Sequence, residues 1–310
     1  MNLSELLGKK ALIPVSSGGH IREALFLYNK FKLSPDSVFV TSQNEQTMSF
    51  TDKYNLTFLD QVSSRDFRGS LFAMPKIMKI SKESNFDFIL STGAAIAISA
   101  VPAHLVHRIP YYYFESITRH NAPSLTGKIL EFFPTVNRFS INYENFGKKW
   151  LKCPSILDDY SVQKISPSAK EMKILVTLGT HSQFRFDRLI DEVLKVLSFG
   201  DEVTWQLGCT ERNNLPGRCF STIGANELKA LAKESDVVFS HGGIGTVLDL
   251  LSVGVSPIVL PRLKEHKEHV DDHQMEALMS FSKSGLIQIL DKDFDRKAMI
   301  RATANSIVKN

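Results

Sequence analysis

The chain of 310 residues lacks the features that mark several common protein classes. It has only three cysteines and no C-x-x-C pair, which argues against a disulfide framework and indicates a reducing, cytoplasmic setting. No apolar run approaches the ~18–20 residues that span a bilayer, and residues 1–15 lack the layout of a signal peptide. No G-x-G-x-x-G follows a strand-like segment, which disfavours an NAD-linked enzyme. The sequence also contains no internal repeat and no low-complexity tract.

Net charge is low as well. The 37 basic and 33 acidic side chains leave a formal charge of +4, too little to indicate nucleic acid as a partner. This mild excess is compatible with an anionic substrate or an anionic membrane surface. A hydrophobic content of 43% is typical of a globular protein, and the length suffices for two domains.

Short strand-like runs alternate with helical patterns along most of the chain. We expect strands at residues 11–16, 37–42, 86–92, 110–116 and 138–142, and again at 173–180, 203–208, 219–224, 236–241 and 256–262. The polar segment 155–173 has little periodicity and is predicted to be a linker. Strand-helix alternation predicts an α/β protein with parallel sheets covered by helices on both faces. We therefore expect two doubly wound, Rossmann-like domains, residues 1–165 and 166–310, facing each other across a cleft.

The first strand-like run ends in the glycine-rich loop S-S-G-G-H, which includes Ser17, Gly18, Gly19 and His20. Ligands of doubly wound sheets bind beyond the carboxyl ends of the strands. His20 is therefore well placed to act as a general base, although it could equally be a histidine that only caps the start of a helix.

A similar polar turn opens the second half of the chain. Gly179, Thr180, His181 and Ser182 follow its first strand and could present amides and hydroxyls to a diphosphate or an acceptor hydroxyl. A solvated turn with a serine helix cap is the structural alternative.

Residues 239–251, F-S-H-G-G-I-G-T-V-L-D-L-L, predict a sharp strand-to-helix turn. Glycine there lets the backbone bend and a ligand approach the amides, and the free N–H groups of a helix N-terminus attract phosphate. Asp249 lies about two turns into the helix, where its carboxylate could accept hydrogen bonds from a ribose diol. A charged residue on the wet face of the helix is the alternative.

Residues 260–278 combine histidines with carboxylates and lysines. The spacing of His266, His269 and His273 matches no common zinc pattern, so we expect no metal. The alternative is a polar loop in which Asp272, His273 and Gln274 hydrogen-bond sugar hydroxyls. Its cations Arg262, Lys264 and Lys267 would suit an anionic donor or could simply be solvated.

Taken together, these motifs resemble GT-B glycosyltransferases of family 28. S-S-G-G-H and Y-Y-Y-F-E-S-I-T-R-H-N-A-P-S-L-T-G-K-I-L resemble an acceptor subunit, and V-T-L-G-T-H-S-Q-F-R-F-D-R-L-I, H-G-G-I-G-T-V-L-D-L-L and E-H-V-D-D-H-Q resemble a donor subunit, as though the two were fused. The family includes the lipid-II-forming GlcNAc transferase, the two-subunit dolichol-pathway GlcNAc transferase and paired bacterial polysaccharide transferases.

The resemblance implies site roles that the residues alone do not establish. His20 and Glu115 become the candidate bases, and the loop Ser17–Gly19 would lie near the acceptor diphosphate. On the donor side it implies roles for Thr180, His181, His241, Gly242, Gly243, Thr246, Asp249, Arg262, Asp272, His273 and Gln274. The assignment of the base stays open, because the loop is shorter than the family's G-G-T-G-G-H and I-T-R-H-N-A interrupts the segment after Glu115.

The implied activity is that of an inverting hexosyltransferase that needs no metal or other cofactor. It would move a sugar from a UDP-sugar, with a weak preference for UDP-glucuronate, to a lipid-diphosphate-linked sugar, and form a β-linkage. An apolar patch with a cationic flank, Leu125, Lys128, Ile129, Phe132 and Phe133, could rest on the inner face of the plasma membrane or pack as an ordinary helix. The rival hypotheses are a UDP-sugar 2-epimerase on the same fold and a non-catalytic nucleotide-sugar-binding subunit.

Overall fold

The chain divides into two units in the computed structural model, Met1–Ile156 and Leu157–Asn310. The structure describes residues 3–59, 67–119, 121–167, 171–179, 183–268 and 273–310. Within these ranges, no helix combines the length and the apolar character needed to span a membrane.

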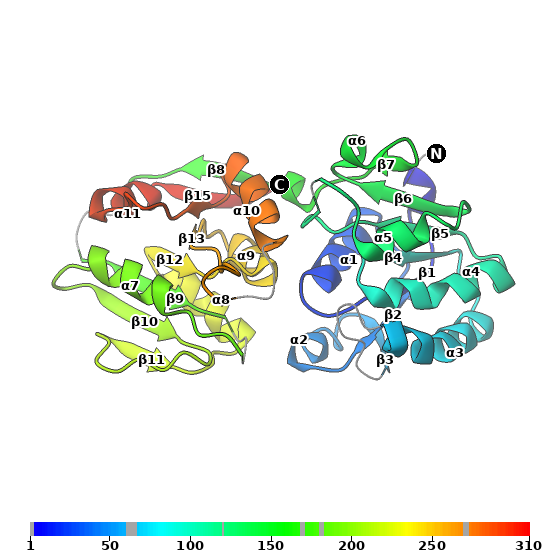
Figure 1. Cartoon of the computed structure of the whole chain (residues 1–310), viewed down its shortest axis with the longest axis horizontal. Helices are drawn as coiled ribbons and strands as arrows, with labels where there is room; N and C mark the ends of the chain where they lie inside the picture. Colours follow the sequence, from blue (N-terminus) through cyan, green and yellow to red (C-terminus); the bar gives the residue numbers. More distant parts are fainter. Residues whose placement is uncertain (1–2, 60–66, 120, 168–170, 180–182, 269–272) are drawn as a thin grey trace. The chain divides into compact units, whose positions relative to one another are not determined.

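The first unit is built on a seven-stranded parallel sheet with the strand order β3-β2-β1-β4-β5-β6-β7 (Figure 1). The strands are β1 (Ala11–Pro14), β2 (Val38–Ser42), β3 (Asn55–Leu59), β4 (Phe88–Ser91), β5 (Tyr111–Phe114), β6 (Val136–Ser140) and β7 (Trp150–Lys152). The central strands β1, β2, β4 and β5 are buried along their whole length, as expected for a sheet covered on both faces.

Helices cover both faces of this sheet. They are η1 (Leu3–Leu6), α1 (Gly19–Lys30), α2 (Glu45–Met48), α3 (Phe67–Glu83), η2 (Ala95–Ala100), α4 (Val101–His107), α5 (Leu125–Leu130) and α6 (Tyr143–Phe146). On one face, α3, η2, α4 and α5 pack in a single apolar cluster with Leu12, Ile89 and Tyr111 of the sheet. On the other face, Tyr28 and Phe31, from α1 and its end, lie against Phe39 and Phe114.

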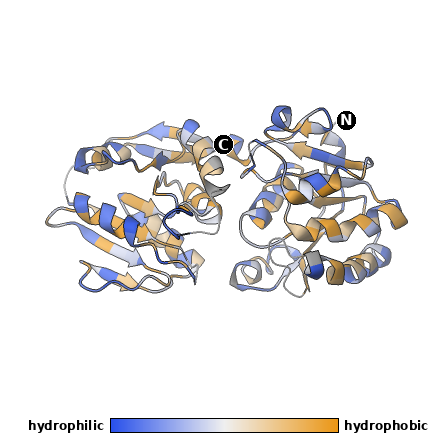
Figure 2. Ribbon diagram, viewed as in Figure 1, coloured by the Kyte–Doolittle hydropathy of each residue, from blue (hydrophilic) through white to orange (hydrophobic). Residues whose placement is uncertain are grey.

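The second unit repeats the plan with a six-stranded parallel sheet in the order β11-β10-β9-β12-β13-β14. Its strands are β9 (Lys173–Thr177), β10 (Glu202–Gln206), β11 (Arg218–Phe220), β12 (Val237–Ser240), β13 (Ile258–Val259) and β14 (Gln288–Ile289), and a separate antiparallel pair is formed by β8 (Tyr160–Lys164) and β15 (Asn305–Lys309). Its helices are η3 (Ile156–Asp159, beginning at the last residue of the first unit), α7 (Asp187–Val196), α8 (Ala225–Glu234), α9 (Ile244–Leu251), α10 (His273–Lys283) and α11 (Arg296–Ala302). Figure 2 shows hydrophobic residues on the strands of this sheet.

The predicted parallel sheets are confirmed, and each of the ten predicted strands overlaps an observed one. Strands β3, β7, β8, β14 and β15 were not predicted, because they are short or lie in part-exposed positions and lack a continuous apolar run. The predicted linker 155–173 is wrong in part, since it contains β8, which pairs with β15. This pairing places the division of the chain after Ile156, before the predicted boundary at residue 165.

Candidate functional site

The glycine-rich loop after β1 ends at the N-terminus of α1, as the sequence predicted. Gly18 has φ +85°, a conformation that favours glycine, and its N–H donates to Gln46 Oε1 at 2.6 Å. Gly19 and His20 begin α1, and Ser17 is partly exposed beside them. The loop therefore leads the backbone directly from the sheet into the helix that carries His20.

His20 is held in one orientation by the end of β4. Its Nδ1 lies 2.8 Å from the carbonyl oxygen of Thr92, and Thr92 Oγ1 donates to the His20 carbonyl at 2.7 Å. Because a carbonyl only accepts, Nδ1 carries the proton in the neutral ring and Nε2 is the acceptor. Burial lowers the pKa of His20, with a further lowering from Arg119 and an opposing effect from the Thr92 hydrogen bond. A neutral histidine with a basic Nε2 is suited to proton abstraction.

Gly93 provides the room for this ring. It has φ +120°, and a Cβ added there would lie 2.8 Å from His20 Cε1. Thr92 and Gly93 thus hold the ring of His20 in place, although no motif in the sequence marks them as site residues.

Glu115, the other candidate base, lies at the end of β5 and is 5% exposed. Its Oε2 accepts from the amide and hydroxyl of Ser124 at 2.8 and 2.9 Å, and its Oε1 accepts from Tyr113 Oη and Ser116 N at 3.1 and 3.2 Å. Burial raises the pKa of Glu115, while these hydrogen bonds oppose the rise. Because four internal donors engage both oxygens, the carboxylate acts in this structure as the anchor of Ser124, the N-cap of α5.

A second buried carboxyl, Glu23, lies near Glu115 and was not among the predicted site residues. Glu23 Oε1 accepts from Ser116 Oγ at 2.8 Å and from Ile117 N at 3.3 Å. Both carboxyls and Thr92 line a cavity of about 30 Å³, large enough for one water. The spacing in the sequence could have pointed to Glu23, because it lies three residues after His20 and hence on the same side of a helix.

In the second unit, the strand-to-helix turn forms as predicted between β12 and α9. Gly242 has φ +78°, and Gly243 caps the eight-residue helix α9. The ring of His241 lies between two glycines: a Cβ on Gly179 or Gly243 would approach its Nε2 to 2.6 or 2.4 Å. Hence these glycines are required by the position of the histidine as well as by the bend.

Two further donor residues follow on α9. Thr246 is partly exposed in its first turn. Asp249, the predicted ribose ligand, forms an ion pair with Lys229 of α8 at 2.9 Å, and the two side chains are 13% and 26% exposed. Nothing local in the sequence pointed to Lys229, because it lies on a different helix, 20 residues earlier.

Arg262 is more deeply buried than the sequence suggested, at 4% exposure. Its Nη1 donates to the carbonyls of Phe184 and Glu268 at 2.9 and 3.1 Å, and its Nη2 donates to the carbonyl of Leu178 at 2.8 Å. The guanidinium also stacks on Phe186. The expectation that Arg262 offers a free cation to an anionic donor is corrected accordingly, because its two terminal nitrogens are bound to backbone carbonyls of its own unit.

The remaining donor candidates lie in part outside the described residues. These are Thr180, His181 and Asp272, together with the side chains of His273 and Gln274, whose backbone begins α10. Among the residues that the structure does describe, no three histidine, cysteine, aspartate or glutamate side chains are grouped as metal ligands.

The predicted apolar patch divides into exposed and packed side chains. Leu125, Lys128 and Phe132 are exposed, and Phe132 is 84% exposed. Ile129 is partly buried, and Phe133 packs on the core cluster beneath the helices. On α3, in the same helical layer, Phe72 is 83% exposed.

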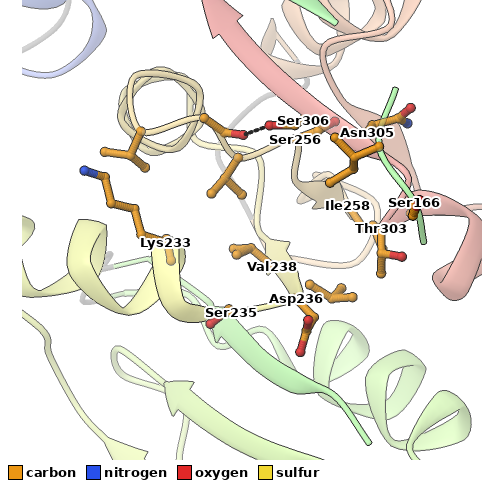
Figure 3. Close-up of a pocket in the computed structure, with 17 residues that line it drawn as sticks. Ser166, Lys233, Ser235, Asp236, Val238, Ser256, Ile258, Thr303, Asn305 and Ser306 are labelled. Atoms are coloured by element: carbon orange, nitrogen blue, oxygen red, sulfur yellow. Dashed lines mark hydrogen bonds between the residues drawn. The ribbon is translucent and has the colours of Figure 1, made fainter. Parts of the chain in front are cut away.

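The larger cavities lie elsewhere. One of about 340 Å³ in the second unit is lined by Asp236, Ser256, Thr303 and Asn305, among others (Figure 3). It adjoins the starts of β12 and β13, whereas the glycine turn follows the end of β12. Since it contains none of the predicted site residues, it does not belong to the candidate site.

Comparison with solved structures shows the fold to which the two units belong. MurG of Acinetobacter baumannii is 17% identical, with a TM-score of 0.57 over 94% of this chain and 87% of that one. The glycosyltransferase SnogD from Streptomyces nogalater is 15% identical, with a TM-score of 0.57 over 96% of this chain and 94% of that one. Together with the two parallel sheets, this likeness establishes the GT-B fold.

Sequence comparison relates the second unit to a known family. Residues 173–302 match the glycosyltransferase family 28 C-terminal domain, and the predicted resemblance to GT-B glycosyltransferases of family 28 is confirmed. The relatives include the UDP-N-acetylglucosamine--N-acetylmuramyl-(pentapeptide) pyrophosphoryl-undecaprenol N-acetylglucosamine transferases of Prochlorococcus marinus strain MED4 and Aquifex aeolicus. They are 22% and 23% identical, over 94% and 95% of this chain and 84% and 90% of theirs.

Proposed function

We propose that the protein is an inverting glycosyltransferase that moves a sugar from a UDP-sugar to a lipid-diphosphate-linked sugar and forms a β-linkage. The observation that carries this proposal is the glycine turn at the head of α9, with Asp249 in the same helix, inside a family 28 C-terminal domain. The names of the relatives, which carry both a UDP-sugar and a pyrophosphoryl-undecaprenol acceptor, support the same substrate classes.

His20 is the better candidate for the base. Its Nδ1 is fixed by Thr92, and Nε2 makes no hydrogen bond within the described part of the chain. Nε2 would take the proton of the acceptor hydroxyl while that oxygen attacks the anomeric carbon and the UDP group departs. Glu115, by contrast, has both oxygens engaged by donors of its own unit.

The donor would bind at the carboxyl end of the second sheet. The backbone amides at the start of α9 would hold the diphosphate, and Asp249 would accept hydrogen bonds from the ribose. No metal enters this scheme, because the helix N-terminus supplies positive potential to the departing diphosphate. Three cations favoured UDP-glucuronate as the donor, and one of them, Arg262, is bound to backbone carbonyls and not offered to a ligand. The names of the relatives contain UDP-N-acetylglucosamine, so this is the first donor to test.

The acceptor side would lie against the cytoplasmic face of the membrane. Leu125 and Phe132 offer exposed apolar surface beside Lys128, and Phe72 adds exposed aromatic surface on α3. Apolar side chains with cationic neighbours favour binding to anionic lipid. A lipid-linked acceptor in that leaflet would then be accessible to the first unit.

A thermal-shift panel with UDP and the UDP-sugars of GlcNAc, glucuronate, galactose and glucose tests the donor assignment. A ligand at 100 times its dissociation constant stabilises by ~2.7 kcal/mol, and Asp249→Ala should abolish that shift. Asp191→Ala, which changes an exposed carboxylate on α7, is the matched control and should keep it. No response to any uridine nucleotide refutes the proposal.

Turnover distinguishes the rival activities. We expect UDP release only when a lipid-diphosphate sugar is present, and His20→Gln should lower it by about 10²–10⁴-fold while leaving the donor shift intact. Conversion of a UDP-sugar without acceptor would instead identify an epimerase. Donor binding without any turnover would indicate the non-catalytic subunit.

A further inference from the structure

We propose that Glu23 is a positioning residue for the acceptor side, which ties the helix that carries His20 to the N-terminus of α5. The inference deepens the proposed function and rests on it for its kinetic part. Its structural part, a clamp between α1, the turn after β5 and α5, stands on contacts within the first unit.

The clamp begins on α1. Glu23 lies one helical turn after His20 and is 7% exposed. It accepts from Ser116 Oγ and from Ile117 N, groups that are 93 and 94 residues away in the chain. A single carboxyl therefore joins the helix of the candidate base to the turn that leaves β5.

The clamp continues through the neighbouring carboxylate. Glu115 precedes Ser116 and binds both the amide and the hydroxyl of Ser124. Ser124 in turn caps α5, where its Oγ accepts from Gly127 N at 3.0 Å. Movement of the turn at Ser116 would thus be passed to the start of α5, which carries the exposed apolar side chains proposed to meet the lipid acceptor.

The two carboxyls differ in how their charges are satisfied. Glu115 has four hydrogen-bond donors and Glu23 has two, so Glu115 accommodates a negative charge better than Glu23 does. Burial raises the pKa of Glu23 to about 8, Glu115 adds to the rise, and the bonds from Ser116 and Ile117 oppose it.

The other groups near Glu23 do not offset a second charge. Thr92 and Cys153 line the small cavity that it shares with Glu115, and His20 on its own helix is kept neutral by burial. Arg119 acts on His20, and Glu23 makes no ion pair among the residues of the described ranges. Ionisation of Glu23 would therefore place two negative charges around Ser116 and loosen the clamp.

Three variants test this role. Glu23→Gln is an isostere of the neutral acid and keeps an acceptor oxygen for Ser116, whereas Glu23→Ala removes it. Glu83→Gln changes an exposed carboxylate on α3 and is the control. We would measure kcat and the KM of donor and acceptor across pH 6–10, and amide hydrogen exchange of residues 124–128 without substrates.

We expect Glu23→Ala to lower kcat/KM for the acceptor by about 10- to 100-fold, to leave the donor-induced thermal shift unchanged and to speed exchange at residues 124–128. Glu23→Gln should stay within about twofold of the wild type at pH 7. It should also retain activity above pH 8, where the wild-type enzyme declines.

The proposal would be overturned if amide hydrogen exchange at residues 124–128 in Glu23→Ala were as slow as in the wild type. It would also be overturned if the variant lowered kcat/KM equally for donor and acceptor. So would identical pH profiles for Glu23→Gln and the wild type. If Glu23→Ala does not fold, Ser116→Ala replaces it, because it removes the same contact from the other side. If the wild type transfers no sugar, the proposed function fails, while the exchange measurement still decides whether the clamp exists.

Discussion

Arg262→Met removes a buried guanidinium that donates to three backbone carbonyls of the second unit. In the wild type this group donates to the carbonyls of Leu178, Phe184 and Glu268 at 2.8 to 3.1 Å. It also lies over the ring of Phe186 at 4.6 Å from the centroid. Methionine has similar length and fills the space, so the change tests the hydrogen bonds more than the packing.

The expected loss follows from these contacts. A hydrogen bond to a charged group contributes about 1.5–3 kcal/mol, so three bonds amount to about 5–9 kcal/mol. Removing the cation also removes its desolvation penalty, which is several kcal/mol for a buried ion. The same desolvation lowers the pKa of Arg262. We therefore expect a net destabilisation of about 3 kcal/mol, equivalent to a Tm lower by about 6–12 °C.

Urea and thermal unfolding, followed by circular dichroism, measure the effect. Arg212→Met is the control, because Arg212 is a half-exposed residue that pairs with Asp187 and Asp191 and should cost less than about 1 kcal/mol. Arg262→Lys keeps the charge but lacks the planar fork, and should lose most of the same stability. An Arg262→Met protein within about 0.5 kcal/mol of the wild type would refute the assignment of Arg262 as a brace.

Three further changes test other parts of the structure. Glu23→Gln should raise the free energy of unfolding. The pKa of the Glu23 carboxyl is 4.5 in the unfolded chain and about 8 in the folded protein, so ionisation favours the unfolded wild type between these pH values. The variant's advantage should therefore grow from pH 4.5 to pH 8 and be on the order of 3 kcal/mol at pH 7 in denaturant titrations. A difference in unfolding free energy between the variant and the wild type that is the same at pH 5 and pH 8 would contradict this prediction. Gly243→Ala should lower the free energy of unfolding by about 1–3 kcal/mol, because the added Cβ meets the ring of His241. Gly243 has a φ of −59°, which alanine also adopts, so the backbone adds no strain and the loss should largely vanish in a His241→Ala background. Phe132→Ser should leave Tm unchanged but weaken binding to anionic vesicles about tenfold in co-sedimentation, and undiminished binding would remove Phe132 from the membrane surface.

Most of the buried strands and the glycine turns of the candidate site could be predicted from the sequence. Buried parallel strands can be recognised as short apolar runs in the sequence, and the glycines at residues 18, 242 and 243 mark the turns that follow them. These signals are local because a run of β-branched residues or a bend at a glycine depends on neighbours in the chain. The edge strand β3 and the pairing of β8 with β15 were missed, since their partial exposure leaves them without such a run.

The roles of individual charged residues were harder to predict from the sequence. Arg262 and Glu115 were predicted to face a ligand, yet their partners are backbone and side-chain groups of the protein itself. Lys229 and Glu23 were not singled out, although each contacts a predicted site residue or its neighbour. Composition and spacing cannot distinguish a carboxylate that meets a substrate from one satisfied internally, because both need the same residue type at a strand end.

The sequence by itself determined that the chain forms two α/β units with glycine turns at their strand ends, because periodicity and backbone freedom are properties of short segments. Only the tertiary structure decided which nitrogen of His20 carries the proton, that Glu115 holds Ser124, the N-cap of α5, and that Glu23 bonds to Ser116. Those outcomes depend on hydrogen bonds between groups 72, 9 and 93 residues apart. Burial then shifts the pKa of His20, Glu23 and Glu115, and the hydrogen bonds that the fold brings to each group oppose part of that shift.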